Sequence, residues 1–143
     1  MRCSRTRRTT NLPHIVNTLR AHAGPGVPIV GINYYGLDLV RWFEDPAAGE
    51  GAAASTVAFN NFLESLYAGA GAPVADVESA FAVTDFTTQA NLQGFGPVPL
   101  SVYNACMLTW ICTPPPLGPD IHATADGYGV IAEAFAQVLG VQV

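Results

Sequence analysis

The amino-acid sequence predicts a mixed α/β fold, because helical and strand-like segments alternate along it. A helix is expected over residues 11–22. A Gly-Pro-Gly break follows it, and then an apolar segment, residues 27–34, that is typical of a strand covered on both faces. A second pair comes next, with a helical apolar stripe over residues 52–68 and a short strand over residues 72–77. These two successive helix-to-strand units are the basis for the fold class.

The elements of the first half begin or end at local signals. Asn11 or Thr10 can cap the first helix, because a short polar side chain accepts hydrogen bonds from the free backbone N–H groups there, and Pro13 fits its first turn. A short amphipathic helix is expected over residues 37–43. The glycines within residues 69–71 are expected to end the longer helix.

The last third of the chain is expected to be helical on both sides of a break. Residues 80–99 show no clear apolar period and predict a long loop. Residues 100–111 predict a helix, which the proline run of residues 114–116 ends. Thr124 can cap the final helix, residues 125–139, whose apolar side chains recur on one face.

Size and composition indicate one folded domain. The chain has 143 residues, and 50% of them are hydrophobic. A chain of this length can bury roughly 68–70% of its unfolded surface. No apolar run reaches the roughly 18 residues that a membrane span requires, so no span is predicted. We expect a disordered Arg-rich start over residues 1–10 and a folded domain over residues 11–143.

Charge is distributed unevenly along the chain. Four of the six basic residues lie in the first eight positions, and after them only Arg20 and Arg41 oppose eleven carboxylates. A phosphate-binding face is therefore not expected beyond the tail, and no nucleic-acid partner is predicted. The basic tail is similar to the start of an export signal but lacks the apolar segment that follows one. A short nucleic-acid-binding arm is the competing interpretation of the tail.

The most informative motif places a carboxylate beside an imidazole. Asp120 and His122 lie at the entrance of the final helix. A carboxylate near a histidine can fix its tautomer and stabilise the imidazolium that forms when it accepts a proton, so the pattern suits a proton-transfer site. The local alternative is a structural pair between His122 and either Asp120 or Asp126. These three residues are too few for a metal site, and neither a metal nor another cofactor is predicted.

Four segments, in their order along the chain, carry a resemblance to a known family. They are Pro28-Ile-Val-Gly-Ile-Asn-Tyr-Tyr, Pro73-Val-Ala-Asp-Val, the stretch from Cys106 to Cys112 with Trp110, and Pro119-Asp-Ile-His-Ala-Thr-Ala-Asp-Gly-Tyr. With these segments, the chain after residue 10 resembles the carboxyl-terminal half of the SGNH hydrolases, the GDSL-type esterases and lipases. The resemblance implies a flavodoxin-like three-layer α/β/α domain that is truncated at its amino-terminal side.

The same resemblance implies the chemistry of a serine ester hydrolase. His122 matches the general base that takes the serine proton during attack on an ester substrate, and Asp120 matches the carboxylate that orients it. Full-length relatives are expected to be secreted. Three family elements, the serine block, the oxyanion-hole glycine and the Gly-x-Asn-Asp block, cannot be placed on this chain. None of the five serines follows Gly-Asp, and no Gly-x-Asn-Asp occurs. We therefore expect the carboxyl-terminal portion of an esterase or lipase, inactive alone, from a truncated or mis-started reading of a longer gene.

The spacing between Asp120 and His122 differs from the one that is common in that family. The family commonly places the aspartate three residues before the histidine, whereas Asp120 precedes His122 by two and Pro119 holds the more usual position. Either Asp120 or a backbone carbonyl near Pro119 is expected to orient the imidazole.

Several alternatives stay open at the level of the sequence. A non-catalytic α/β module, or a gene fragment, could associate with itself or another chain through an unsatisfied sheet edge, because a two-stranded sheet is marginal alone. Cys106 and Cys112 form either a disulfide, which requires the helix to end or bend between them, or two small buried residues. Asn33, Tyr34 and Tyr35 are expected to face a ligand crevice at the end of the first strand, where the tyrosines either line an acyl pocket or pack under a loop.

Overall fold

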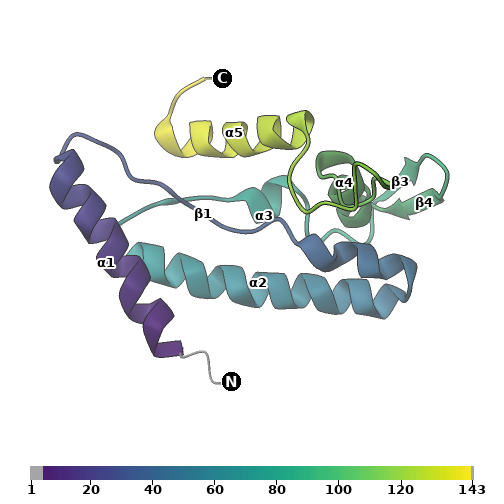
Figure 1. Cartoon of the computed structure of the whole chain (residues 1–143), viewed down its shortest axis with the longest axis horizontal. Coiled ribbons are helices and arrows are strands. Elements are labelled where there is room, and N and C mark those ends of the chain that lie inside the picture. Colours follow the sequence, from purple (N-terminus) through teal and green to yellow (C-terminus); the bar gives the residue numbers. More distant parts are fainter. Residues whose placement is uncertain (1–4, 143) are drawn as a thin grey trace.

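The computed structural model describes residues 5–142 as helices with two small sheets, which confirms the mixed α/β class; the sheet of β3 and β4 lies at one end of the molecule (Figure 1). Each sheet has two strands. In chain order the elements are α1 (Arg5–Ala23), β1 (Gly31–Ile32), the 3-10 helix η1 (Leu37–Phe43), α2 (Pro46–Gly69), β2 (Val74–Ala75), α3 (Val77–Ala80), β3 (Gln89–Leu92), β4 (Gly96–Pro99), α4 (Leu100–Leu108) and α5 (Ala125–Leu139).

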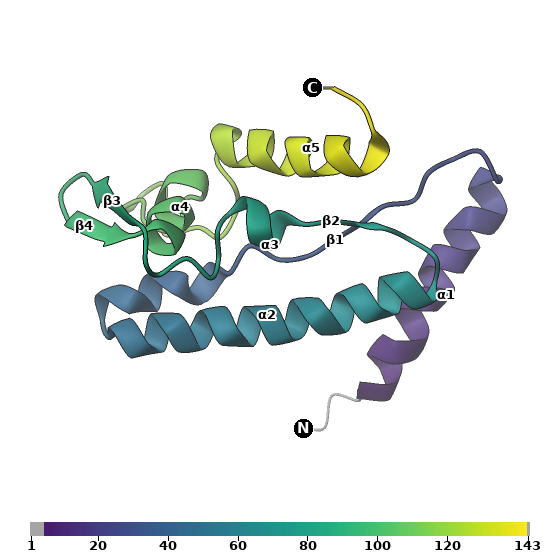
Figure 2. The same cartoon turned by 180° about the vertical axis from the view of Figure 1, so that it is seen from behind.

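A parallel sheet of two short strands lies between long helices. β1 pairs with β2, with Gly31 opposite Val74 and Ile32 opposite Ala75. Figures 1 and 2 show α5 on one side of these strands and α2 on the other. A Cβ atom at Gly31 would lie 2.7 Å from the ring of Tyr67 in α2. Glycine at this position therefore lets the strand pack closely on the helix.

Two helices begin earlier than the sequence predicted. α1 begins at Arg5, so Pro13 lies inside the helix and not in its first turn. Residues 1–4 of the expected Arg-rich start lie outside the described residues. α2 begins at Pro46, because Asp45 accepts a hydrogen bond from the backbone N–H of Ala47 at 3.1 Å and proline suits the first helical position.

Residues 80–99 contain a hairpin where the sequence predicted only a loop. β3 and β4 pair antiparallel, from Gln89 opposite Pro99 to Leu92 opposite Gly96. Gly94 and Gly96 have positive φ angles of 87° and 86°, which allow the chain to reverse. Leu92 is the one fully buried residue of β3, so the strand lacks the apolar alternation by which hairpins are recognised.

The main hydrophobic core joins the parallel sheet to α5 and to the segments before α4. Among its most buried members are Leu39, Val77, Phe81 and Val83, each at most 1% exposed. Full burial of such a side chain stabilises the fold by about 1.5–3 kcal/mol. Within residues 5–142, no helix has the combined length and apolar character needed to cross a membrane.

Candidate functional site

The Asp120 and His122 pair lies on a loop whose two ends are tied together. α4 ends at Leu108, and Thr109 then takes an extended conformation and forms an isolated bridge with Ala123. The backbone N–H of Trp110 donates to the carbonyl of His122 at 3.0 Å, and that of Asp120 donates to the carbonyl of Trp110 at 3.1 Å. The loop therefore has a defined conformation where it presents the imidazole.

The final helix begins directly after this loop, as the sequence predicted. Thr124 caps α5, because its hydroxyl accepts a hydrogen bond from the backbone N–H of Gly127 at 3.2 Å. The same hydroxyl donates to the carbonyl of Met107 at 3.2 Å. The cap thus ties the start of α5 to the end of α4.

Asp120 binds both the ring and the backbone of His122. Its Oδ1 lies 2.5 Å from Nδ1 of the imidazole and accepts the backbone N–H of His122 at 2.8 Å. The backbone N–H and then the ring of His122 lower the pKa of the Asp120 carboxyl. The side chains of His122 and Asp120 are 70% and 47% exposed. Because Nδ1 contacts the carboxylate, Nε2 of this open imidazole is the nitrogen available to another molecule.

Tyr35 connects this loop to the end of β1. Its hydroxyl donates to the carbonyl of Ile121 at 3.0 Å, and its ring stacks on Phe81 with 4.8 Å between centroids. Burial, followed by the neighbouring Tyr128 and Asp120, raises the pKa of Tyr35. Tyr35 is therefore neutral at physiological pH and holds the backbone between the two residues of the pair.

Two buried asparagines fix the chain just before Tyr35. Asn33 lines an apolar groove at the end of β1, where a crevice was expected; it is 2% exposed, and its Oδ1 accepts the backbone N–H groups of Val77 and Glu78 at 2.7 and 3.0 Å. Asn60 of α2 is fully buried; it accepts the N–H of Tyr34 at 2.9 Å and donates to the carbonyl of Tyr34 at 2.8 Å. Asn33 therefore borders this groove, while its amide oxygen satisfies buried backbone groups.

Asn60 was not singled out in the sequence, although a signal was present. It lies in a helix whose neighbouring positions, Phe59 and Phe62, are apolar. A polar residue at a buried helical position must be hydrogen-bonded, so it indicates a tertiary contact without naming the partner. Asp76, in contrast, caps α3 by accepting the backbone N–H of Ser79 at 3.1 Å. Partial burial acts to raise the pKa of Asp76, but hydrogen bonds from Ser79 and Asn33 outweigh it and lower the pKa.

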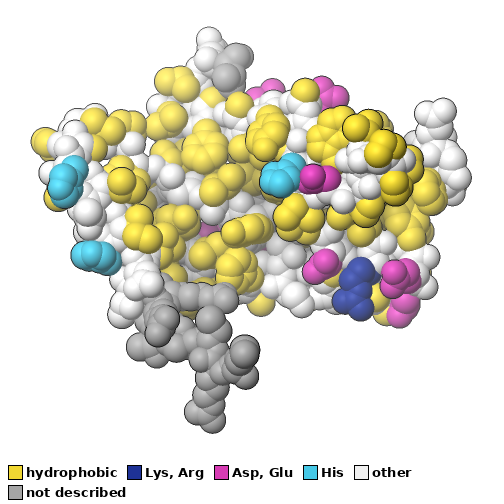
Figure 3. Space-filling model, in the orientation of Figure 1, with side chains coloured by type: hydrophobic (Ala, Val, Ile, Leu, Met, Phe, Trp, Pro, Cys, Tyr) yellow, Lys and Arg dark blue, Asp and Glu magenta, His cyan; other side chains and the backbone are white. Residues whose placement is uncertain are grey.

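An apolar groove of about 500 Å³ borders the end of β1. Its walls come from α1, β1 and α2, and none of the side chains that line it is charged. Tyr35 lines this groove and also holds the Asp120 to His122 loop. Hydrophobic side chains gather on the face of the molecule between α5 and α2 (Figure 3). The residues that line the groove are Asn11, Leu12, Ile15, Ile32, Asn33, Tyr34, Tyr35, Phe59, Leu63, Leu66 and Tyr67.

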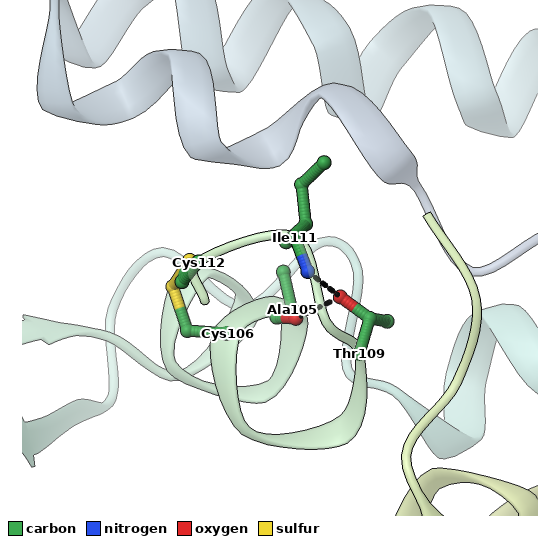
Figure 4. Close-up of a disulfide and its surroundings, with 5 residues drawn as sticks. All are labelled: Ala105, Cys106, Thr109, Ile111 and Cys112. Atoms are coloured by element: carbon green, nitrogen blue, oxygen red, sulfur yellow. Dashed lines mark hydrogen bonds between the residues drawn. A yellow bond between two sulfur atoms is a disulfide. The ribbon is translucent and has the colours of Figure 1, made fainter. Parts of the chain in front are cut away.

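Cys106 and Cys112 form a disulfide, which decides between the two alternatives left by the sequence (Figure 4). Their Cα atoms are 5.0 Å apart. This is possible because the helix ends between them: the hydroxyl of Thr109 donates to the carbonyl of Ala105 at 2.6 Å and accepts the backbone N–H of Ile111 at 3.2 Å. The chain bends at Thr109 and brings the second cysteine back to the first.

No serine in the described part of the chain hydrogen-bonds to His122. Ser55 and Ser65 donate to carbonyls within α2, and Ser101 is fully buried. Within residues 5–142, no group of three or more His, Cys, Asp or Glu side chains could hold a metal ion. Among the described residues, the pair of Asp120 and His122 therefore has no serine bonded to it.

Comparison of the chain with protein-family models, curated proteins and solved structures gives no match. The resemblance to the SGNH hydrolases rests on the sequence segments that carry it.

Proposed function

We propose that Asp120 and His122 are the acid and base of a serine ester hydrolase, and that this chain is the carboxyl-terminal portion of such an esterase or lipase. The observation that carries the proposal is the 2.5 Å contact between Asp120 Oδ1 and Nδ1 of an imidazole whose side chain is 70% exposed. A carboxylate on Nδ1 is the arrangement that prepares Nε2 to accept a proton.

The proposed reaction begins with proton transfer to His122. Nε2 takes the hydroxyl proton of a serine as that oxygen attacks the ester carbonyl carbon, and Asp120 stabilises the imidazolium. The imidazolium then gives its proton to the departing alcohol, which leaves an acyl-serine. Water, deprotonated by His122, attacks the acyl group; the bond to the serine oxygen breaks, that oxygen takes the proton back from the imidazolium, and the acid is released. The serine and the donors for the oxyanion come from outside residues 1–143, so the chain alone is inactive.

The same proposal includes a more specific fold class than mixed α/β. We place the chain in the flavodoxin-like three-layer α/β/α class of the SGNH hydrolases. In support, the parallel pair of β1 and β2 lies between α2 and α5 (Figures 1 and 2), and the His122 loop directly precedes the last helix.

The first experiment measures hydrolysis of p-nitrophenyl acetate and butyrate by the purified chain. We expect no turnover above that of His122→Ala, because the nucleophile is missing. Hydrolysis by the chain that His122→Ala abolishes would show that the chain is active alone and would contradict the inactivity.

The second experiment tests the role of His122. The DNA immediately upstream is translated in all frames, and the chain is extended by any segment that carries Gly-Asp-Ser and Gly-x-Asn-Asp. The extended protein should hydrolyse the esters, and His122→Ala should lower kcat by about 10³-fold or more. Asp126→Asn is the matched control, since Asp126 is an exposed carboxylate in the first turn of α5. Absence of both blocks upstream, or full activity of His122→Ala, would refute the proposal.

A further inference from the structure

One edge of β1 is unpaired. The N–H of Gly31 donates to the carbonyl of Pro73 at 2.7 Å, and the N–H of Asn33 donates to that of Ala75 at 3.5 Å. The N–H and C=O groups of successive strand residues point to opposite sides, so those of Ile32 point away from β2. Within residues 5–142, neither group of Ile32 has a hydrogen-bond partner.

The unpaired residue borders the apolar groove. Ile32 lines this groove together with Leu12 and Ile15 of α1 and with Phe59 and Leu63 of α2. Ile15 is 52% exposed, although it is a large apolar side chain. An unpaired backbone edge and an uncharged apolar groove therefore coincide at Ile32.

We propose that this edge and groove bind an extended, uncharged apolar segment of another polypeptide, which pairs with Ile32 as a third strand. Main-chain hydrogen bonds would satisfy the edge, and alternate side chains of the segment would fill the groove. The proposal rests on the edge and the groove of residues 1–143, and it does not require Asp120 and His122 to be catalytic; in the extended esterase proposed above, an upstream strand would take this edge in place of another polypeptide.

The unpaired edge at Ile32 and the uncharged groove together favour an extended apolar segment over other ligands. An aliphatic ligand could fill the groove, but it would leave the N–H and C=O groups of Ile32 without partners. A charged segment would lose hydration in a groove whose lining holds no opposite charge. α2 and α5 flank β1 (Figures 1 and 2), so a bare strand reaches the edge more readily than a second whole copy of this chain.

The test uses acetyl-Thr-Val-Thr-Val-Thr-Val-amide as the probe and the same peptide methylated on every backbone nitrogen as the control. Amide hydrogen exchange of the chain is followed by NMR. We expect the peptide to slow exchange at the N–H of Ile32 by about tenfold or more. Exchange at Gly31 and Asn33, which already bond to β2, should change little. The methylated peptide should not protect Ile32, because it lacks backbone N–H donors and its N-methyl groups block pairing with the edge of β1.

A pair of variants tests the groove. Leu63→Asp places a carboxylate in the groove and should weaken peptide binding by about tenfold or more. Asn61→Asp adds the same charge to an exposed position of α2 outside the groove and should leave binding within about twofold. Protection of Ile32 in the unmodified chain decides the proposal if Leu63→Asp does not fold.

Four outcomes would overturn the proposal. The first is no binding of the peptide at about 1 mM, a concentration at which a weak interaction is detectable. The second is binding without protection of Ile32, or equal binding of the methylated peptide. The third is binding of decanoate in place of the peptide, which would assign the groove to an aliphatic ligand. The fourth is a dimer by light scattering that protects Ile32 in the free chain, which would assign the edge to a second copy.

Discussion

Replacement of Asn33 by alanine is expected to destabilise the fold strongly, because one amide serves several buried groups. Its Oδ1 accepts the N–H groups of Val77 and Glu78, and its Nδ2 donates to Glu64 at 3.0 Å and to Asp76 at 2.9 Å. Val77 is 0% exposed, so its N–H cannot turn to bulk water once the acceptor is lost. The side chain of Asn33 thus joins β1 to the start of α3.

The size of the loss follows from these groups. A buried donor without a partner costs about 1–3 kcal/mol, and the lost bonds to carboxylates and the small cavity bring the expected destabilisation by Asn33→Ala to about 2–4 kcal/mol. For a chain of 143 residues, about 4 °C of Tm per kcal/mol gives a decrease of about 8–16 °C. Thermal unfolding followed by circular dichroism at pH 7 measures this difference.

Two further variants, Asn61→Ala and Asn33→Asp, serve as controls for the stability measurement. Asn61→Ala removes an exposed asparagine from α2 and should change stability by less than about 0.5 kcal/mol. Asn33→Asp keeps an acceptor oxygen but adds a carboxylate beside Glu64 and Asp76. Burial and these like charges raise the pKa of the introduced carboxyl above its unfolded value, so the penalty is present at pH 7 and decreases as the pH falls toward 5. A loss below about 1 kcal/mol in Asn33→Ala would refute the reasoning.

Three further predictions concern the disulfide, a buried hydroxyl and an exposed carboxylate. Changing Cys106 and Cys112 together to alanine removes a crosslink across a separation of 6 residues, and the chain-entropy relation gives a loss of about 2 kcal/mol in urea unfolding; equal stability of both forms would contradict it. Ser101 has an Oγ without a partner among the described residues, so Ser101→Ala should stabilise the fold or change its thermal unfolding by less than about 0.5 kcal/mol, and a clear loss would argue for an unseen partner. Hydrogen bonds led by the backbone N–H of Thr88 lower the pKa of Asp85 to about 2. Their stabilising effect is present above the ordinary carboxyl pKa and is lost as the pH falls from about 4 to about 2, so Asp85→Asn should flatten the acid dependence of stability, and identical profiles would exclude this role.

Features that depend on neighbouring residues could be predicted from the sequence. The final helix and its cap at Thr124 are confirmed, because an apolar period and a capping side chain are both local signals. The contact between Asp120 and His122 is also local, since the two residues are separated by one position. The hairpin of β3 and β4 was missed because its strands have four residues each and their apolar residues do not alternate, so the segment with its glycine turn resembled a loop.

Features that join distant segments could not be predicted in this way. The hydroxyl of Tyr35 reaches the carbonyl of Ile121 across 86 positions, and Asn60 reaches Tyr34 across 26. The same sequence pattern would have allowed the side chains of Tyr35 and Asn60 to face solvent. The choice is made by tertiary packing, which sets the partners of buried polar groups after the elements have come together.

This division between local and distant contacts bears on the candidate site itself. The aspartate and histidine can meet in any flexible loop, because a carboxylate two residues before an imidazole can bend back to it. Under the proposed function, the pair also needs a fixed place in the fold. What places the pair is the rest of the fold: the bond from Trp110 closes the loop, and the bond from Tyr35 ties it to the end of β1. A base for an external hydroxyl needs an orientation fixed relative to the body that binds the substrate. Under the proposed function, the hydroxyl of Tyr35, which links the loop both to β1 and to the apolar groove, would meet this need.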